Sequence, residues 1–380
     1  MDKLEEIRKE LDVIDDELVA LYLKRMDTVR RVAAAKTDGH IPLNNTEREN
    51  AIVYRLTKDI PDEMKLYVSE LYKSVFHTSK SYQASLMNKS SATADKLEEL
   101  LKSELPQLPV SAAIACQGVK GANSGAAAKR LFPISEITYF KSFEGVFAAV
   151  EKGLCEFGVL PIENSTAGSV SEVYDLMKKH NFYIVRSAKV KIEHCLVVKQ
   201  GADKSAVKKV ISHPQALSQC AEYLKKLGVE IQPVESTALA AKIVSESDDP
   251  TIAALCSAEC SQVYGLKILE TSVQDSPVNS TRFICIAKNL KIYKGADKIS
   301  VMMSISHSSG SLNSLLGKFA ALGLNLTKIE SRPIPNSEFE FMFYFDFEGD
   351  VADKKVRNLI AELENGSDKF IFLGVYKELI

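Results

Sequence analysis

Apolar residues in the first 88 positions repeat at helical spacing. Six of them follow one another at alternating intervals of three and four: Leu4, Ile7, Leu11, Ile14, Leu18 and Leu21. This spacing places them on one stripe of a long helix that packs against other helices. The segment 37–42 breaks this helix, and further helices are expected over 45–58 and 62–86. The pattern therefore predicts an all-helical domain over residues 1–88.

Between residues 110 and 290, short apolar runs alternate with helical patterns. Strands are expected over 110–116, 156–161, 183–188, 195–199, 209–212 and 252–256, with a further apolar strand over 283–287. Such alternation predicts an α/β domain with substantially parallel sheets. The preceding segment, 89–109, opens with small polar residues and is expected to be a linker with one short helix.

The last region, 297–380, shows a third pattern. Strands are expected over 298–305, 325–332, 338–347 and 369–376, and helices over 310–321 and 351–363. The order βαββαβ is typical of ferredoxin-like α+β domains. The third strand places a phenylalanine at every second position from 339 to 347, so one face is predicted to be core. The chain is thus predicted to be a multi-domain protein.

Composition and charge exclude several classes of protein. The formal net charge is −2, which gives no reason to expect a nucleic-acid or anionic-membrane partner. No apolar run approaches the roughly 20 residues that span a bilayer, and the charged start is unlike a signal peptide. The seven cysteines form no C-x-x-C pair, which indicates buried thiols in a cytoplasmic protein and no zinc site. The glycosylation pattern at Asn279 is then expected to be unused.

Cations interrupt the apolar stripe of the first helix. Arg25 occupies the next stripe position, where an unpaired buried guanidinium is costly. It either pairs with the protein or snorkels, or it binds an anion. Lys36 lies about 20° around the helix from Arg25, which favours an anion. Arg8 lies about 25 Å away along the helix and can reach the same small molecule only from a second chain. On the third helix, Ser79 and Gln83 share a face.

These residues give the first 88 positions a resemblance to the all-helical chorismate mutases. The set is Arg8, Arg25, Lys36, Arg48, Glu49, Ser79 and Gln83. The resemblance implies two intertwined chains that share each site. Arg8 of the partner subunit and Arg25 would hold the two carboxylates of chorismate.

The remaining roles also follow from this resemblance. Lys36 and Gln83 would donate to the ether oxygen, Glu49 would bind the ring hydroxyl, and Arg48 and Ser79 would complete the pocket. The reaction needs a held conformer and stabilised charge on the ether oxygen, which Arg and Lys supply. Asn45 stands where relatives often have Asp, so altered affinity for chorismate is expected.

Polar motifs follow three expected strands of the α/β region, at 118–124, 161–168 and 212–219. Such strand ends are where α/β folds bind ligands, although a tight turn or a helix cap accounts for each motif alone. With Asn279-Ser280-Thr281-Arg282-Phe283 they resemble the prephenate dehydratases, whose hallmark is Thr-Arg-Phe. Two positions depart from that pattern, Val119 and Asn123, where the family usually has proline and an aromatic residue.

The resemblance implies a domain like the periplasmic binding proteins and loss of CO2 and hydroxide from prephenate. Thr281 would donate to the leaving hydroxyl. Asn164, Ser212 and Gln219 would be pocket donors, with Glu163 nearby. For Arg282 two roles stay open, an anchor for a substrate carboxylate or a scaffold.

The last region resembles the ACT regulatory domain on two motifs. One is Gly310-Ser311-Leu312 at a helix start, where glycine lets an anion or another chain approach unless it is a simple cap. The other is Glu330-Ser331-Arg332-Pro333 at a strand end. The resemblance implies that Gly310, Leu312, Glu330, Ser331 and Arg332 bind phenylalanine between paired domains and inhibit the dehydratase.

Taken together, the chain resembles the bifunctional chorismate mutase–prephenate dehydratases of phenylalanine biosynthesis. The resemblance implies chorismate and prephenate as substrates, phenylalanine as effector, a homodimer or larger assembly, and no cofactor or metal. A fused prephenate dehydrogenase would need a dinucleotide fold, and no G-x-G-x-x-G follows any expected strand. Two further interpretations stay open, a non-catalytic amino-acid sensor and a mutase fused to an arogenate dehydratase.

Overall fold

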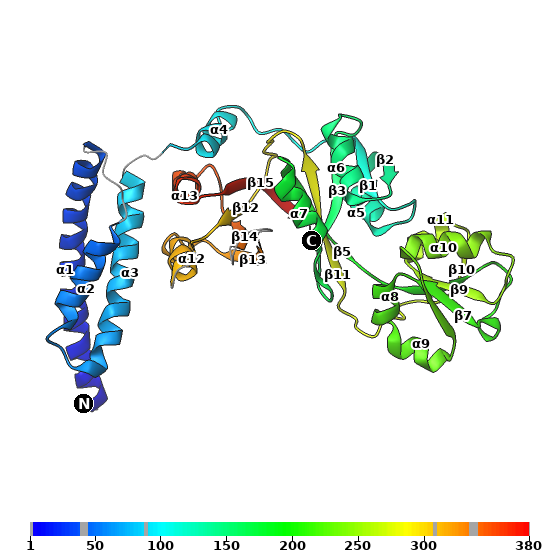
Figure 1. Ribbon diagram of the computed structural model, residues 1–380, viewed down its shortest axis with the longest axis horizontal. Coiled ribbons are helices and arrows are strands. Elements are labelled where there is room, and N and C mark those ends of the chain that lie inside the picture. Colours follow the sequence, from blue (N-terminus) through cyan, green and yellow to red (C-terminus); the bar gives the residue numbers. More distant parts are fainter. Residues whose placement is uncertain (1–2, 39–44, 87–89, 307–309, 334–340, 380) are drawn as a thin grey trace. The chain divides into compact units, whose positions relative to one another are not determined.

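The structure, a computed structural model, describes residues 3–38, 45–86, 90–306, 310–333 and 341–379 (Figure 1). These residues fall into two compact units. One comprises residues 1–103 and 301–371, and the other comprises residues 104–300 and 372–380. The boundary passes through two strands of the C-terminal region, so that region contributes to both units.

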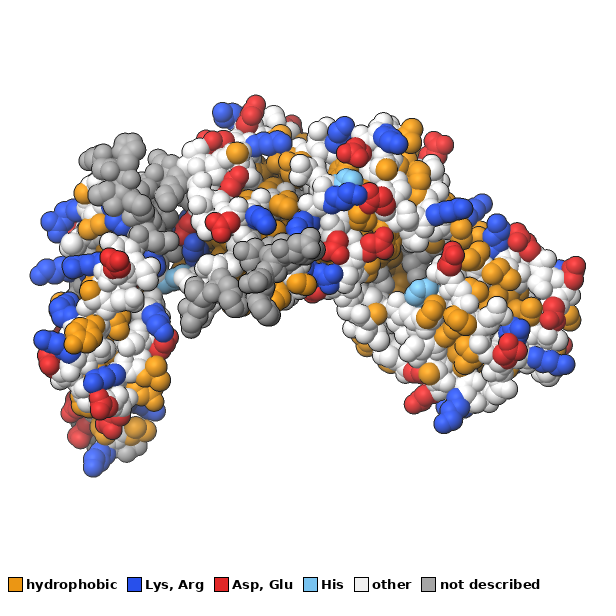
Figure 2. All heavy atoms as spheres, viewed as in Figure 1, with side chains coloured by type: hydrophobic (Ala, Val, Ile, Leu, Met, Phe, Trp, Pro, Cys, Tyr) orange, Lys and Arg blue, Asp and Glu red, His pale blue; other side chains and the backbone are white. Residues whose placement is uncertain are grey.

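The first unit begins with the predicted helices. They are α1 (Lys3–Asp38), α2 (Thr46–Thr57) and α3 (Asp62–Leu86), and α1 and α2 each pack against α3 (Figure 1). Their shared core is small and includes Val29, Ala33 and Phe76. The six residues of the apolar stripe predicted on α1 are 45–64% exposed. The stripe is therefore not buried within this chain. Hydrophobic side chains accordingly interrupt the charged surface of these helices (Figure 2).

The expected linker contains one short helix, α4 (Ala92–Leu100). The side chain of Ser91 caps its first turn, and Leu97 is fully buried. Helix α4 packs on α13 (Lys354–Asn365). The backbone N–H of Thr93 donates to the Glu364 carboxylate of α13 at 3.1 Å. An acceptor at this position satisfies one of the free amides at the helix start.

The C-terminal region has the predicted order of elements. These are β12 (Lys298–Ser304), α12 (Ser311–Ala321), β13 (Leu326–Pro333), β14 (Phe341–Glu348), α13 and β15 (Phe370–Leu379). The strands are arranged as β13-β14-β12-β15, a ferredoxin-like order. Of the phenylalanine stripe, Phe345 and Phe347 are buried, whereas Phe341 and Phe343 are partly exposed. Position 339 of the stripe lies outside the described residues.

The second unit contains two sheets, each forming a lobe with its helices. The first lobe has the strand order β15-β5-β11-β3-β1-β2. Besides the end of β15, its strands are β1 (Ser111–Gln117), β2 (Ile134–Phe140), β3 (Phe157–Asn164), β5 (Tyr183–Lys191) and β11 (Ser280–Ala287), with the short β4 (Gly168–Ser169) beside β3. Helices α5 (Asn123–Leu131), α6 (Phe143–Glu151) and α7 (Ser171–Lys179) pack in this lobe.

The second lobe has the strand order β10-β6-β9-β7-β8. Its strands are β6 (Cys195–Val198), β7 (Lys209–Ser212), β8 (Glu230–Pro233), β9 (Ile252–Cys256) and β10 (Lys267–Glu270). Its helices are α8 (Pro214–Gln219), α9 (Ala221–Leu227), α10 (Thr237–Glu246) and α11 (Ala258–Val263). The chain enters this lobe through 192–194 and returns to the first through 271–279.

All the strands predicted in this region are present, but the parallel prediction holds only in part. Strand β1 is parallel to β2 and β3, and β7 is parallel to β8 and β9. Strand β11 is antiparallel to both β3 and β5, and β6 is antiparallel to β9 and β10. The sheets are therefore mixed.

The cysteines have the environment that the sequence predicts. All seven lie within 90–306, and each is free and buried. Burial raises the pKa of the Cys116 and Cys220 thiols to about 12. Among the described helices, none has the length and apolar character that crossing a membrane requires.

Candidate active site

The Thr-Arg-Phe motif opens strand β11 beside the end of β3. Thr281 pairs with Asn164 in the antiparallel register, and the Asn164 Nδ2 donates to the Thr281 Oγ1 at 3.0 Å. The threonine oxygen is thus an acceptor in this bond and keeps its own proton for another partner. In the part of the chain that the structure describes, no protein acceptor contacts that proton. Thr281 can therefore donate to a bound molecule.

Asn164 is held in one orientation by donors on its other side. Its Oδ1 accepts the backbone N–H groups of Thr166 and Ala167 at 3.0 and 2.9 Å. The Gln215 Nε2 from α8 of the second lobe approaches the same oxygen at 3.4 Å. An asparagine at a strand end commonly binds backbone amides two and three residues on. Because Oδ1 faces these donors, Nδ2 has to face Thr281.

Asn279 extends this contact toward the second lobe. It is 3% exposed, and its Oδ1 accepts from the Asn164 Nδ2 at 2.8 Å. Its Nδ2 donates to the Gln219 Oε1 at 2.9 Å. Gln219 is the last residue of helix α8. Asn279 therefore links Asn164, Gln219 and Thr281, which the sequence predicted as site residues, although it was not itself predicted as one.

His194 completes the chain of hydrogen bonds. It is 3% exposed, and its Nε2 lies 3.0 Å from the Gln219 Oε1. An amide oxygen only accepts, so the proton of this bond belongs to the imidazole. Burial lowers the pKa of His194, against a smaller opposite effect of the bond to Gln219. The residue is therefore neutral near pH 7 and protonated on Nε2.

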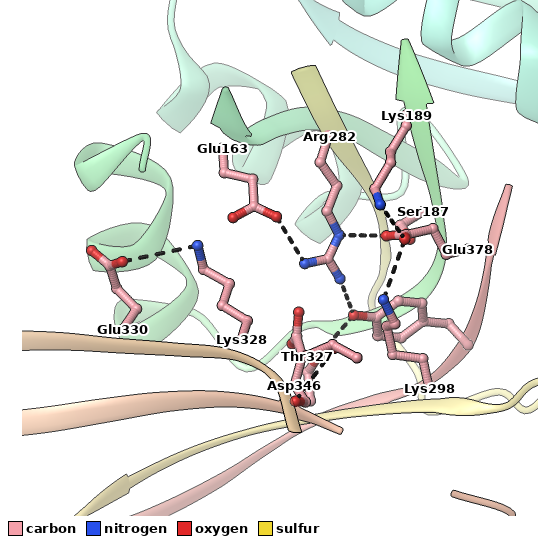
Figure 3. Close-up of polar contacts among 12 residues, drawn as sticks. Glu163, Ser187, Lys189, Arg282, Lys298, Thr327, Lys328, Glu330, Asp346 and Glu378 are labelled. Carbon is pink, nitrogen blue, oxygen red and sulfur yellow. Dashed lines mark hydrogen bonds and ion pairs between the residues drawn. The ribbon is translucent and has the colours of Figure 1, made fainter. Parts of the chain in front are cut away.

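Arg282 and Glu163 lie on the opposite face of the same two strands. Successive side chains of a strand point to opposite faces, so Arg282 faces away from Thr281. The Arg282 guanidinium contacts the Glu163 carboxylate at 3.2 Å and the Glu378 carboxylate at 2.7 Å. It also donates to the Tyr376 hydroxyl at 2.6 Å. Figure 3 shows Arg282 between the two carboxylates.

The surroundings of Glu378 indicate which role Arg282 has. Arg282 is 4% exposed, and Glu378 also contacts Lys189 and Lys298 at 3.2 and 3.3 Å. Burial acts to raise the pKa of Glu378, but Arg282, Lys298 and Lys189 outweigh it and lower that pKa. An arginine held in this way on the face away from Thr281 fits a scaffold role rather than a substrate anchor.

Ser212 stands apart from this group. It ends β7 and is fully buried, and its Oγ donates to the Leu255 carbonyl at 2.7 Å. Within the described residues, no hydrogen bond joins it to Thr281, Asn164 or Gln219. Its hydroxyl holds neighbouring strands together, and the adjacent His213 caps α8.

The turn at 118–124 joins the two lobes. Gly118 and Gly121 have φ of 107° and 89°, a backbone conformation that favours glycine. Val119 packs against the core of the second lobe, and the Tyr264 hydroxyl donates to the Lys120 carbonyl at 2.9 Å. Val119, one of the two departures from the dehydratase pattern, therefore has a packing role.

On helices α1 and α3, Arg25, Ser79 and Gln83 come together. The Arg25 guanidinium donates to the Ser79 hydroxyl and lies 5.9 Å from the Phe76 ring centroid. Ser79 and Gln83 are buried. The Gln83 Nε2 donates to the Ser79 carbonyl at 3.3 Å, and its Oε1 is buried without a partner among the described atoms. In this orientation the amide offers an acceptor rather than the donor predicted for the ether oxygen.

The other predicted mutase residues are more exposed or otherwise engaged. Lys36 is partly buried, and Arg8 and Arg48 are exposed. The Glu49 carboxylate pairs with Lys80 of α3 at 3.1 Å. The Asn45 Oδ1 accepts from the Arg48 backbone N–H at 2.8 Å and caps α2. One chain thus assembles part of this site.

The predicted effector residues lie at two places in the C-terminal region. Gly310 precedes α12 with φ of 84°, and Leu312 is 36% exposed. Strand β13 carries Glu330, Ser331 and Arg332, with Glu330 and Arg332 on one face and Ser331 on the other.

Comparisons with known proteins match the regions that carry both candidate sites. The family model "Prephenate dehydratase" matches residues 114–291, and "Chorismate mutase type II" matches residues 7–84. "Arogenate dehydratase/prephenate dehydratase 2, chloroplastic" of Arabidopsis thaliana is 38% identical over 275 residues, which cover 69% of this chain and 72% of that protein.

Two further similarities cover the chain differently. "Bifunctional chorismate mutase/prephenate dehydratase" of Escherichia coli is 29% identical over 382 residues, which cover 97% of this chain and 95% of that protein. The structure of a prephenate dehydratase in complex with L-Phe, from Arthrobacter aurescens, has a TM-score of 0.64 and 29% identity. That match covers 70% of this chain and 89% of that one.

Proposed function

The chain belongs to the prephenate dehydratase family and also carries a chorismate mutase segment, and on this premise we propose which residues perform each reaction. The protein has chorismate mutase and prephenate dehydratase activity, the two activities in the name of the E. coli relative. It therefore converts chorismate to prephenate and prephenate to phenylpyruvate.

In the dehydration, the Thr281 hydroxyl donates a hydrogen bond to the hydroxyl group that leaves prephenate. In this reaction the bond to the departing carboxylate breaks, its electron pair makes the ring aromatic, and the C–O bond to the hydroxyl breaks. Negative charge grows on the leaving oxygen, where a preorganised donor stabilises the transition state. The observation that carries the assignment is the bond from Asn164, which makes Thr281 Oγ1 an acceptor and leaves its proton for the substrate.

The test is the pair Thr281→Ala and Thr281→Ser in the full chain. Thr281→Ala is expected to lose dehydratase activity while chorismate is still converted to prephenate. Thr281→Ser keeps the hydroxyl and is expected to retain part of the activity. Dehydratase turnover in Thr281→Ala at the rate of the unsubstituted enzyme would show that another group assists the leaving hydroxyl.

The mutase site is completed by a second copy of the chain. Arg25, Ser79 and Gln83 are together in one chain, whereas Arg8 is exposed and about 25 Å from Arg25 along α1. The stripe on α1 is 45–64% exposed, and full burial of such a side chain is worth roughly 1.5–3 kcal/mol. A partner helix covering this stripe would bury it and supply Arg8 of the partner subunit. Sedimentation of the intact protein should therefore show a dimer or a larger assembly.

Phenylalanine binding to the C-terminal region inhibits the dehydratase. Support comes from the ferredoxin-like strand order, the position of Glu330 and Arg332 on one face of β13 and the L-Phe complex of the Arthrobacter relative. Strand β15 of this ACT-like region carries Glu378, which pairs with Arg282 next to Thr281. Product analysis with chorismate should show phenylpyruvate that falls when phenylalanine is added. Prephenate formation with no effect of phenylalanine on phenylpyruvate would remove the effector assignment.

Arogenate is a second candidate substrate because the Arabidopsis relative is named for both activities. Arogenate carries an amino group where prephenate carries a keto group, so the two differ away from the leaving hydroxyl. Comparing kcat/KM for both substrates decides between them. The seven buried free thiols support the cytoplasmic location expected from the sequence.

A further inference from the structure

We propose that His194 is a positioning residue of the dehydratase. Its Nε2–H fixes the Gln219 amide so that Gln219 presents its own N–H groups to an oxygen of the substrate. The inference deepens the role proposed for Thr281, since the same chain of bonds ends at Thr281.

The hydrogen bonds fix the orientation of each amide in turn. Gln219 Oε1 accepts from both His194 Nε2 and Asn279 Nδ2, at 3.0 and 2.9 Å. Asn279 therefore turns its Oδ1 the other way, where it accepts from Asn164 Nδ2 at 2.8 Å. Reversing any one of these amides would place donors against donors or acceptors against acceptors. The arrangement at Thr281 thus depends on the arrangement at His194.

The Gln219 Nε2 is the donor that this chain of hydrogen bonds positions. This nitrogen is buried and has no hydrogen-bond partner among the described residues. Leaving a buried donor unsatisfied is unfavourable, so a partner for this nitrogen is expected. With Oε1 occupied by two donors, the free N–H groups are what Gln219 offers to a ligand. Prephenate supplies suitable acceptors in its carboxylates.

The position of His194 in the fold supports a positioning role. His194 lies in the segment that enters the second lobe, and Asn279 lies in the segment that returns from it. The His194 backbone N–H donates to the Gln274 side chain at 3.0 Å, and its carbonyl accepts from the Val273 N–H at 2.9 Å. The backbone of His194 therefore ties the segment that enters the second lobe to the segment that returns from it, and the imidazole adds the bond to Gln219. Burial keeps it neutral, so it donates one defined hydrogen bond.

Three substitutions of His194 separate positioning from simple packing. His194→Gln places an amide donor at about the reach of Nε2, His194→Leu fills the space without a donor, and His194→Asn is too short. The dehydratase kcat is expected to fall on the order of 10- to 100-fold in the Leu and Asn variants, as small misplacements do. His194→Gln should restore it to within a few-fold. Mutase turnover of the same preparations, with circular dichroism, controls for folding.

A double-mutant cycle with Gln219→Ala tests whether His194 acts through Gln219. If it does, His194→Leu costs little further activity once Gln219 is gone, because coupled residues are not additive. Additive losses would overturn the proposal, as would equal activity of the Leu and Gln variants. Thr281→Ala reports on the hydroxyl donor separately, so failure here leaves that assignment standing.

Discussion

The mutase helices and the dehydratase lobes build their sites in opposite ways. The dehydratase lobes bury large apolar cores and join Asn164, Gln219 and Thr281 through hydrogen bonds within one chain. The mutase helices leave the α1 stripe about half exposed and bring together only part of their predicted site. The larger set of joined site residues thus lies in the unit with the larger buried core. Substitutions in each unit can test this contrast separately.

A charge on the α1 stripe should have the largest effect, lowering mutase activity and leaving dehydratase activity unchanged. Leu18→Asp places a carboxylate on the surface expected to meet the second copy, so the assembly should dissociate. Mutase kcat/KM is then expected to fall on the order of 100-fold or more, because Arg8 of the partner subunit no longer helps to position chorismate. Dehydratase turnover should stay close to its original value. Asp16→Lys, on the opposite face by heptad position, is the matched control and should leave both activities and the sedimentation unchanged.

Removal of the Arg282 guanidinium should affect stability in the other unit. Arg282→Met removes the guanidinium shared by the partly exposed Glu163 and the buried Glu378. Lys189 and Lys298 still contact Glu378, so the cost is expected at the lower end of the about 3–5 kcal/mol for a broken buried pair. Thermal unfolding followed by circular dichroism and by dehydratase activity measures this. Lys291→Met removes an exposed ion pair with Glu156 and should cost at most about 1 kcal/mol. Equal unfolding temperatures for the two variants would contradict the scaffold role of Arg282.

The depressed pKa of Glu378 predicts a pH dependence of stability with a definite sign. The pKa of this carboxyl is below its ordinary 4.5 in the folded chain, so the unfolded chain binds its proton first as pH falls. Its contribution to stability is complete above about pH 4.5 and declines as pH falls through the lowered pKa. Urea midpoints of Glu378→Gln should therefore differ from the original protein at pH 7 and converge with it in acid. Glu193→Gln removes an exposed pair with Lys191 and should leave the urea midpoint close to that of the original protein.

The smallest effect is expected at Asn45. Its Oδ1 caps α2, and Asp caps a helix about as well as Asn, so Asn45→Asp should leave stability unchanged. A change of a few-fold in the KM for chorismate is expected, with little change in mutase kcat. A rise of kcat by orders of magnitude in steady-state assays would show that Asn45 limits turnover.

Sequence patterns anticipated the order of the elements because burial periodicity is local. The helices, the predicted strands of the α/β region and the βαββαβ order all follow from spacings of two or of three to four residues. Strands β2, β4, β8 and β10 were missed. They are short or only partly buried, so their composition does not stand out from loops.

Site residues within motifs were predicted from the sequence, whereas contacts between distant segments were not. Asn164, Gln219 and Thr281 lie in motifs, whereas His194 joins the site only through Gln219, 25 residues away. Asn279 stands in the same motif as Thr281, but no local spacing reports its bonds to residues 60 and 115 positions away. The face of Arg282 was readable from strand alternation alone, because it directly follows Thr281.

The most direct test of the contrast mixes two mutase variants. Arg8→Ala and Arg25→Ala, each expected to lack mutase activity, are co-expressed with different tags and the mixed assemblies are purified. In a symmetric dimer each mixed pair has one site with both arginines intact and one with neither, so mutase activity should return to about half of the original in purified mixed dimers. Dehydratase activity should be full throughout. No return of mutase activity in the mixed dimers would contradict a site shared between chains.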